Sequence, residues 1–257
     1  MNFFRNFLAS FLGSITALIL IISLGFFLLA GIASVATFDK NILQDEISSN
    51  SILNLDLDKN VYDNIPITQE FEEILGVSPE IIKFLDLIDA IELATENKDI
   101  KGINLKTQSP KMGWSQALTI RKSLQRFKDK GKFIYTYGDF FSQKGYYLAS
   151  VSDSIFLNPM GNIELRGLGA EVLYYKELQE KYGFKMEVIR HGKYKSAVEP
   201  YLDDKMSEAN RSQIRSLLNS IWGGIANQIK LSRKVSTENF NKVVDNLDAT
   251  LPVNAFR

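Results

Sequence analysis

The sequence predicts a layered α/β domain with one membrane-spanning helix in front of it. Two observations lead to this class. From about residue 51 onward, short strand patterns alternate with helical patterns, which is typical of a sheet covered by helices. Before that point lies a long stretch without a single charged residue. With 257 residues, the chain is long enough for one large domain or two small ones.

The uncharged stretch runs from Phe7 to Phe38, and its most apolar part is Ile15 to Ala33. As a helix, this part is long enough to cross a hydrocarbon core of about 30 Å. A cleaved signal peptide is the alternative, but the apolar stretch of such peptides usually has only about 7–15 residues. We therefore expect a membrane anchor over residues 1–38 and a polar linker over residues 39–50.

Charged residues flanking the anchor indicate its orientation. Arg5 precedes the span, whereas Asp39, Asp45 and Glu46 follow it with only Lys40 for balance. Positive residues tend to stay in the cytoplasm. We expect the amino terminus to be cytoplasmic and the rest of the chain to lie on the far side of the membrane.

The first elements of the domain follow from periodicity. Residues 51–57 alternate apolar and polar side chains, as a half-buried strand does. Residues 79–91 carry apolar side chains at helical spacing, and Ser78-Pro79 is typical of a helix start. Residues 100–105 form a second strand pattern, and residues 114–130 form a helix that ends at a glycine.

The same reasoning covers the rest of the chain. We expect further strands at residues 132–138, 154–157 and 185–190. We expect a turn at residues 158–161, and helices at residues 144–150, 171–182 and 207–233, the last of which begins with a serine cap. Such alternation predicts that much of the sheet is parallel.

Composition excludes several functions. The chain has 30 basic and 30 acidic residues and no long basic run, so nucleic acid is not an expected partner. Without cysteine, and with His191 as the single histidine, it offers no disulfide, thiolate nucleophile, zinc cluster or Ser-His-Asp triad. Phosphate-loop, dinucleotide and common serine-hydrolase signatures are also missing. We expect no metal and no cofactor.

The most specific stretch runs from Arg190 to Tyr201 and reads Arg-His-Gly-Lys-Tyr-Lys-Ser-Ala-Val-Glu-Pro-Tyr. It resembles the lysine motif of the signal peptide peptidase A family. Residues 142–150, 157–161 and 167–171 match further motifs of this family in the same order. The resemblance covers the anchor and residues 50–257, and it is to the long form of the family, which has two related halves.

The resemblance implies a crotonase/Clp-protease-like fold of stacked ββα units over residues 51–257. It implies a serine/lysine endopeptidase that degrades cleaved signal peptides, located in the bacterial inner membrane with its peptidase domain on the periplasmic side. The family's first half supplies a lysine general base, which is Lys195 here, and its second half supplies the serine. A ring of four subunits is also implied. The abrupt carboxyl end suggests that this chain is a truncated first half.

The nucleophile motif of the family's second half is similar to Ser-Gly-Gly-Tyr, and the matching place here is Gln143-Lys144-Gly145-Tyr146. Glutamine has no nucleophilic hydroxyl. Ser142 lies one residue early, and one helical step turns a side chain by about 100°. The family's first half tends to carry a glycine-rich turn after the strand that residues 100–105 match. Residues 107–113 replace that turn here, so we expect no oxyanion hole in this half. The chain alone is therefore expected to be inactive.

A lysine that acts as a base must lose its proton, which requires its pKa to fall by roughly three units from about 10.4 through desolvation. A pocket closed by a second domain could lower the pKa of Lys195, and Lys193 on the same side of an extended segment could assist. Glu199 could orient the lysine or cap a turn. The alternatives are a catalytically silent membrane-anchored scaffold or an acyl-CoA enzyme of the crotonase type.

Overall fold

The computed structural model describes residues 2–38, 47–64, 81–189, 191 and 195–255. The chain divides into two compact units, Met1–Ser48 and Ser49–Arg257. In the first unit, helix α1 (Asn2–Phe38) is continuous. Its stretch Phe3–Gly31 has a mean hydropathy of 2.5 and is long and apolar enough to cross a membrane. An apolar helix that could span a bilayer therefore precedes the second unit, although a signal sequence would meet the same criteria.

The second unit is built on a four-stranded sheet in which every neighbouring pair is parallel. Its strand order is β1 (Ser51–Asp56), β4 (Ile100–Lys106), β5 (Phe133–Phe141), β6 (Ser154–Ile163). A smaller parallel pair joins β2 (Asn60–Tyr62) to β3 (Ile81–Lys83). The predicted α/β class with a parallel sheet is confirmed.

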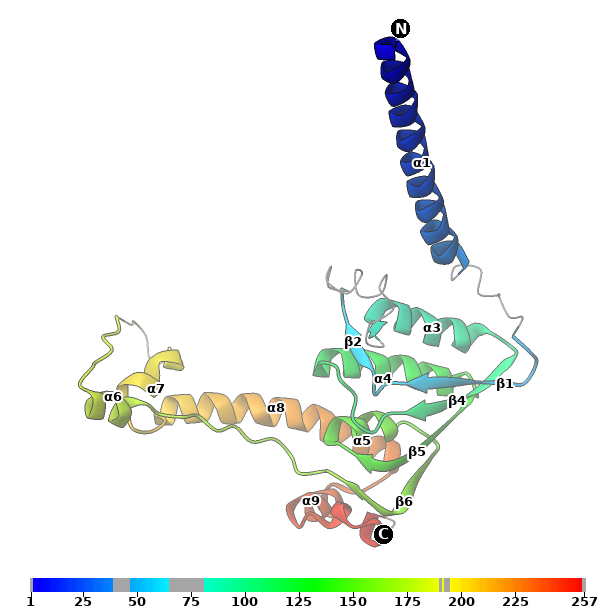
Figure 1. Ribbon diagram of the computed structural model, residues 1–257. Helices are drawn as coiled ribbons and strands as arrows, with labels where there is room; N and C mark the ends of the chain where they lie inside the picture. Colours follow the sequence, from blue (N-terminus) through cyan, green and yellow to red (C-terminus); the bar gives the residue numbers. More distant parts are fainter. Residues whose placement is uncertain (1, 39–46, 65–80, 190, 192–194, 256–257) are drawn as a thin grey trace. The chain divides into compact units, whose positions relative to one another are not determined.

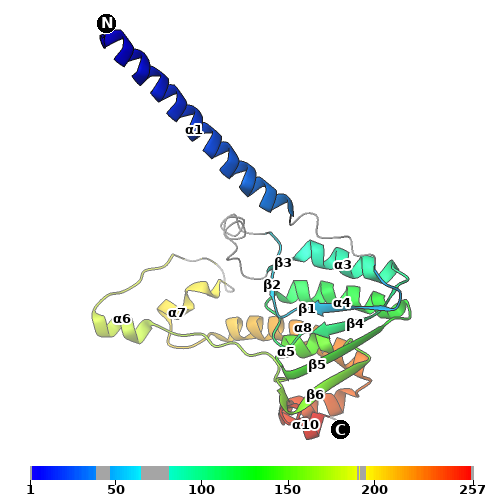
Figure 2. The same ribbon diagram turned by 45° about the vertical axis from the view of Figure 1, so that its right-hand side comes forward.

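Three helices follow the strands and bury their apolar sides against the sheet: α3 (Phe84–Glu96), α4 (Trp114–Asp129) and α5 (Gln143–Ala149). Figures 1 and 2 show α3 and α4 side by side, next to β1 and β4. The core contains fully buried side chains from strands and helices alike, among them Leu105, Ile134, Leu124 and Phe127. We call residues 49–163 the body.

The chain then leaves the sheet through an irregular segment. Residues 164–175 lead to α6 (Lys176–Tyr182), and residues 196–202 form the 3-10 helix η2 (Ser196–Val198) and α7 (Glu199–Leu202). We call residues 164–207 the arm. The long helix α8 (Glu208–Arg233) follows, and Figure 1 shows α6 and α7 near its beginning. The chain closes with α9 (Thr237–Asp245), η3 (Asp248–Thr250) and α10 (Pro252–Ala255).

The helices predicted at residues 114–130 and 207–233 are confirmed as α4 and α8. The helix predicted at residues 79–91 instead begins at Phe84 and extends to Glu96, because residues 81–83 pair with β2. Its predicted Ser-Pro start lies outside the described residues.

The turn predicted at residues 158–161 is wrong. Strand β6 continues through this stretch to Ile163, and the stretch bulges opposite Asp139. Gly161 permits this, because a Cβ there would overlap the carbonyl oxygen of Asp139. A bulge and a turn use the same residue types, so composition alone does not separate them.

Two predictions in the arm are also wrong. The helix predicted at residues 171–182 begins only at Lys176, because the amide of Tyr175 is bonded to the carbonyl of Pro200 at 2.7 Å instead of to a helical partner. The strand predicted at residues 185–190 is not formed over residues 185–189, and residue 190 lies outside the described part. A strand needs a neighbouring strand to bond with, and no strand of the described residues pairs with this stretch.

Candidate functional site

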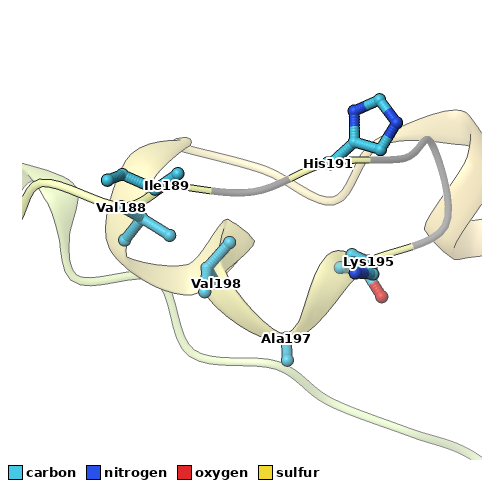
Figure 3. Close-up of a pocket in the computed structure, with 7 residues that line it drawn as sticks. Val188, Ile189, His191, Lys195, Ala197 and Val198 are labelled. Atoms are coloured by element: carbon cyan, nitrogen blue, oxygen red, sulfur yellow. The ribbon is translucent and has the colours of Figure 1, made fainter.

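Lys195 lies at the start of η2, where its side chain is exposed. Its motif is only partly described: Arg190 and residues 192–194, which include Lys193, lie outside the described residues. Figure 3 shows Lys195 in a pocket of about 460 Å³, with apolar side chains and one histidine around it. The lining residues are Val188, Ile189, His191, Lys195, Ser196, Ala197 and Val198.

A second hollow of about 350 Å³ adjoins the first on the other side of η2. Ser196 and Ala197 line it together with Val172, Pro200 and the first turns of α8 as far as Leu217. Lys195 lines the first hollow, and the residue after it, Ser196, lines both. Within the described residues, no group of three or more Asp, Glu or His side chains could hold a metal ion.

Glu199 is buried four residues after Lys195. Its carboxylate accepts hydrogen bonds from the Ser207 hydroxyl at 2.5 Å and from the Asn210 amide at 2.8 Å. Ser207 is the N-cap of α8, so this carboxylate secures the connection from the lysine segment to that helix. Of the two roles considered from the sequence, capping is the one supported by these contacts.

The segment that matches the family's nucleophile motif lies in the body, at the start of α5. Ser142 is the N-cap of α5: its hydroxyl accepts from the amide of Gly145 at 3.1 Å, and its own amide donates to the carbonyl of Gln108 at 2.8 Å. Gln143 uses its side chain to bind the backbone of Arg166 and Gly167. Ser142 and Gln143, the two residues at or next to the position that matches the nucleophile, therefore both have structural roles.

The loop after β4 packs directly on this segment. A Cβ at Gly145 would overlap the carbonyl oxygens of Thr107 and Gln108. The amide of Ser109 is already bonded to the Asp58 carboxylate at 2.6 Å. An oxyanion hole needs amide groups aimed at the substrate, whereas this loop turns carbonyls toward α5 and commits the Ser109 amide within the fold.

Lys144 was missed as a residue of interest by the sequence reasoning. Its ammonium donates to the carbonyl of Met112 and lies 5.5 Å from the centre of the Trp114 ring. Partial burial lowers the pKa of Lys144 below its ordinary value. A lysine in the first turn of a helix is unfavourable for the helix dipole, and that mismatch is the sequence signal that could have drawn attention to it.

Buried Arg121 joins the body to α8. Its guanidinium donates to the carbonyl of Tyr147 and the hydroxyl of Ser150 on one side and to the Ser232 hydroxyl at 2.7 Å on the other. It also stacks 4.8 Å from the ring centre of Tyr147. Desolvation lowers the pKa of Arg121 to about 10, so it stays charged at neutral pH.

The lysine and the α5 segment are attached to opposite ends of α8. Glu199 binds Asn210, near the beginning of α8, whereas Tyr147 of α5 donates through its hydroxyl to Gln228 at 2.7 Å. Along a helix, these two anchor points are about five turns, or about 27 Å, apart. That span is several times the length of a lysine side chain, so Lys195 is not brought to the start of α5.

Comparisons with known proteins agree with the motifs. Residues 126–249 match Peptidase family S49. The chain is 32% identical to Protease 4 of Haemophilus influenzae over 85% of its own length and 36% of the relative's, and 33% identical to Protease 4 of Salmonella typhi over 65% and 28%. A chloroplastic serine protease SPPA of Arabidopsis thaliana is 32% identical over 48% of this chain and 18% of its own.

The chain thus spans only about a third of the length of the bacterial relatives that it matches. A solved structure described as an enoyl-CoA hydratase/isomerase from Acinetobacter baumannii aligns with 63% of this chain and 78% of its own length at 11% identity. Its TM-score of 0.26 is too low to support an argument about the fold. The fold class rests on the parallel sheet and its helices.

Proposed function

Because this chain is a relative of signal peptide peptidase A and carries a region of Peptidase family S49, we propose that it supplies the lysine general base of a serine/lysine endopeptidase. The observation that carries the proposal is the position of Lys195. It stands exposed among apolar side chains, far along α8 from the α5 segment of its own body.

In the proposed mechanism, the neutral amine of Lys195 takes the proton from a serine hydroxyl as that serine attacks the peptide carbonyl. The resulting ammonium then returns the proton to the leaving amine. The base must be neutral before each cycle, which requires removal from water. Val188, Ile189 and Val198 already line one wall of the pocket, and a second peptidase half would close it.

The serine comes from that second half, since this chain has Gln143 at the matching position and Ser142 in use as a helix cap. The loop over residues 107–113 also supports a serine from the second half, because this loop offers a poor oxyanion hole for a serine of its own half. This chain is then the first of two halves, with an anchor over residues 1–38, a linker over 39–50 and a peptidase domain over 51–257.

The proposed substrates are short apolar peptides, above all cleaved signal peptides that remain in the bilayer. Helix α1 is long and apolar enough to hold the enzyme at the membrane that contains them. The charges around it favour an orientation with the peptidase domain on the far side of the membrane, and the family resemblance favours the bacterial inner membrane with this domain on the periplasmic side. The family resemblance favours a ring of four subunits.

Two assays test the division into halves. The purified 257-residue chain should not hydrolyse a fluorogenic apolar peptide, and a serine-directed fluorophosphonate should not label it. Addition of a serine-bearing half should produce turnover and labelling of that half alone. Turnover by this chain alone would refute the proposal.

A further inference from the structure

The side chain of Gln143 binds the backbone of two adjacent residues, Arg166 and Gly167. Its Oε1 accepts from the amides of Arg166 at 3.0 Å and Gly167 at 2.9 Å, and its Nε2 donates to the carbonyl of Gly167 at 3.0 Å. One amide group thus binds both the donor and the acceptor of Gly167. Such a pairing fixes position and direction together, which one hydrogen bond does not.

Gly167 has an unusual backbone conformation shortly after the end of the sheet. Strand β6 ends at Ile163, and Glu164 still donates its amide to the carbonyl of Phe141 at 2.8 Å. At Gly167 the backbone has a φ of +88°, a conformation that side-chain-bearing residues rarely adopt. Gly167 lies near the start of the arm, four residues after the end of β6.

We propose that Gln143 is a positioning residue: it fixes the backbone at Gly167, near the start of the arm, and thereby the path along which the arm carries Lys195. The catalytic consequence rests on the proposed function, whereas the effect on the arm does not. The other end of the arm is secured where Glu199 binds α8. With both ends fixed, the lysine segment is presented in one place to its partner.

The identity of residue 143 differs between the two halves of the family. Gln143 stands where the family's second half has its nucleophilic serine, and a serine side chain is too short to reach the Gly167 backbone in this way. Glutamate matches the length and the acceptor but would place a second oxygen against the carbonyl of Gly167. Glutamine alone provides both the acceptor and the donor at this reach.

The absence of cysteine makes a direct test feasible. Spin labels at Lys122→Cys on α4 and Glu177→Cys on α6, both exposed positions, report the distance between body and arm. In the full chain we expect Gln143→Ala and the volume-matched Gln143→Met to broaden this distance distribution about twofold or more. Gln143→Glu should fall between these variants and the wild type.

The matched control is Gln125→Ala, since Gln125 is exposed on α4 and its side-chain amide donates to Asp129 of the same helix at 3.0 Å. It should leave the distribution unchanged. A wild-type distribution in Gln143→Met would overturn the proposal, because it would mean that the hydrogen bonds do not hold the arm. Equal broadening in Gln125→Ala would overturn it too, because it would indicate general loosening.

Activity separates this inference from the proposed function. In the enzyme completed by a serine half, Gln143→Met should lower kcat/KM on the order of tenfold or more, as misplacement of a catalytic group does. The pH at which activity rises should stay the same, because the base itself is unchanged. Broadening of the distances without any peptidase activity in the wild type would refute the function and leave the positioning role intact.

Discussion

The body and the arm of the second unit are held together by different forces. The body surrounds a continuous apolar core in which Leu105, Ile120 and Ile134 have no exposed surface. The arm leaves large apolar side chains in solvent, with Tyr182 69% and Ile189 fully exposed. Apart from Leu165 at its start, the buried side chains among the described residues of the arm are polar, and they bind backbone groups and a helix cap.

Gln179 and Glu199 are the two buried polar centres of the arm. Gln179 donates to the carbonyl of Tyr201 at 2.7 Å and accepts from the amide of Met186 at 2.9 Å, while Glu199 secures the start of α8. Polar bonds define a shape but bury little apolar surface. The body shares one buried apolar core with α8 and α9, to which Ile229 and Phe240 belong, whereas the arm leaves large apolar side chains exposed.

The largest expected effect comes from a substitution that breaks the connection between the body and α8. Arg121→Ala leaves several buried acceptors without a donor and opens a cavity beside Tyr147, so we expect the free energy of unfolding to fall by about 3–5 kcal/mol. Urea titration of the detergent-solubilised chain measures this. The control is Arg126→Ala, whose exposed pair with Glu92 should contribute less than about 1 kcal/mol.

If the two variants lost equal stability, the view of Arg121 as the joint between body and helix would be wrong.

A pair of glycine substitutions compares the two regions directly. Gly145→Ala in the body pushes a methyl group into the carbonyls of Thr107 and Gln108, so we expect a loss of about 1–3 kcal/mol. Gly169→Ala in the arm meets no atom within 4 Å and should be neutral or slightly stabilising. Thermal unfolding of both variants checks the contrast, and a larger loss from Gly169→Ala would reverse it.

Glu199→Ala should damage the arm and spare the body. Removing the carboxylate leaves the Ser207 hydroxyl and the Asn210 amide without this acceptor, at a cost of about 1–3 kcal/mol. We expect faster hydrogen exchange in residues 195–210 and unchanged protection in β4 and β5. Equal loss of protection in the sheet would indicate that arm and body unfold as one.

The smallest expected effect is the pH dependence contributed by Lys144. Its pKa is lowered in the folded chain by desolvation, so the unfolded state binds this proton more tightly. The penalty is fully present below the folded pKa and disappears as pH rises toward the ordinary value of 10.5. Relative to Lys144→Met, the wild type should therefore gain stability with rising pH in that window, and a relative loss would contradict the burial of this ammonium.

The contrast between body and arm also explains what the sequence could predict. In the body, local periodicity and burial agree, so residues 100–105 and 114–130 adopt the predicted states. In the arm, residues 185–189 have a strand-like composition, but none of the strands that the structure describes pairs with them. A sequence pattern states which faces are apolar and leaves open whether a partner is present to pair with them.

The candidate site likewise has features that the sequence predicts and features that only the structure shows. The match to the family motif predicts Lys195 as the base, which stays a prediction, and a single histidine in the composition leaves no Ser-His-Asp triad pattern to propose. The capping by Glu199, the bond between Gln143 and Gly167 and the desolvation of Lys144 all depend on contacts between residues far apart in the sequence. Single side chains such as these carry no periodic signal, so a sequence pattern does not reveal their partners.

The central claim is that Lys195 is the base of an enzyme completed by a second half, and the rate of Lys195→Arg in that enzyme tests it most directly. Arginine keeps the charge but is not deprotonated in proteins. We expect kcat/KM on an apolar peptide to fall by about 10²–10⁴-fold, while Lys185→Arg, at an exposed position of the arm, stays near the wild-type value. A near wild-type rate for Lys195→Arg would contradict the account.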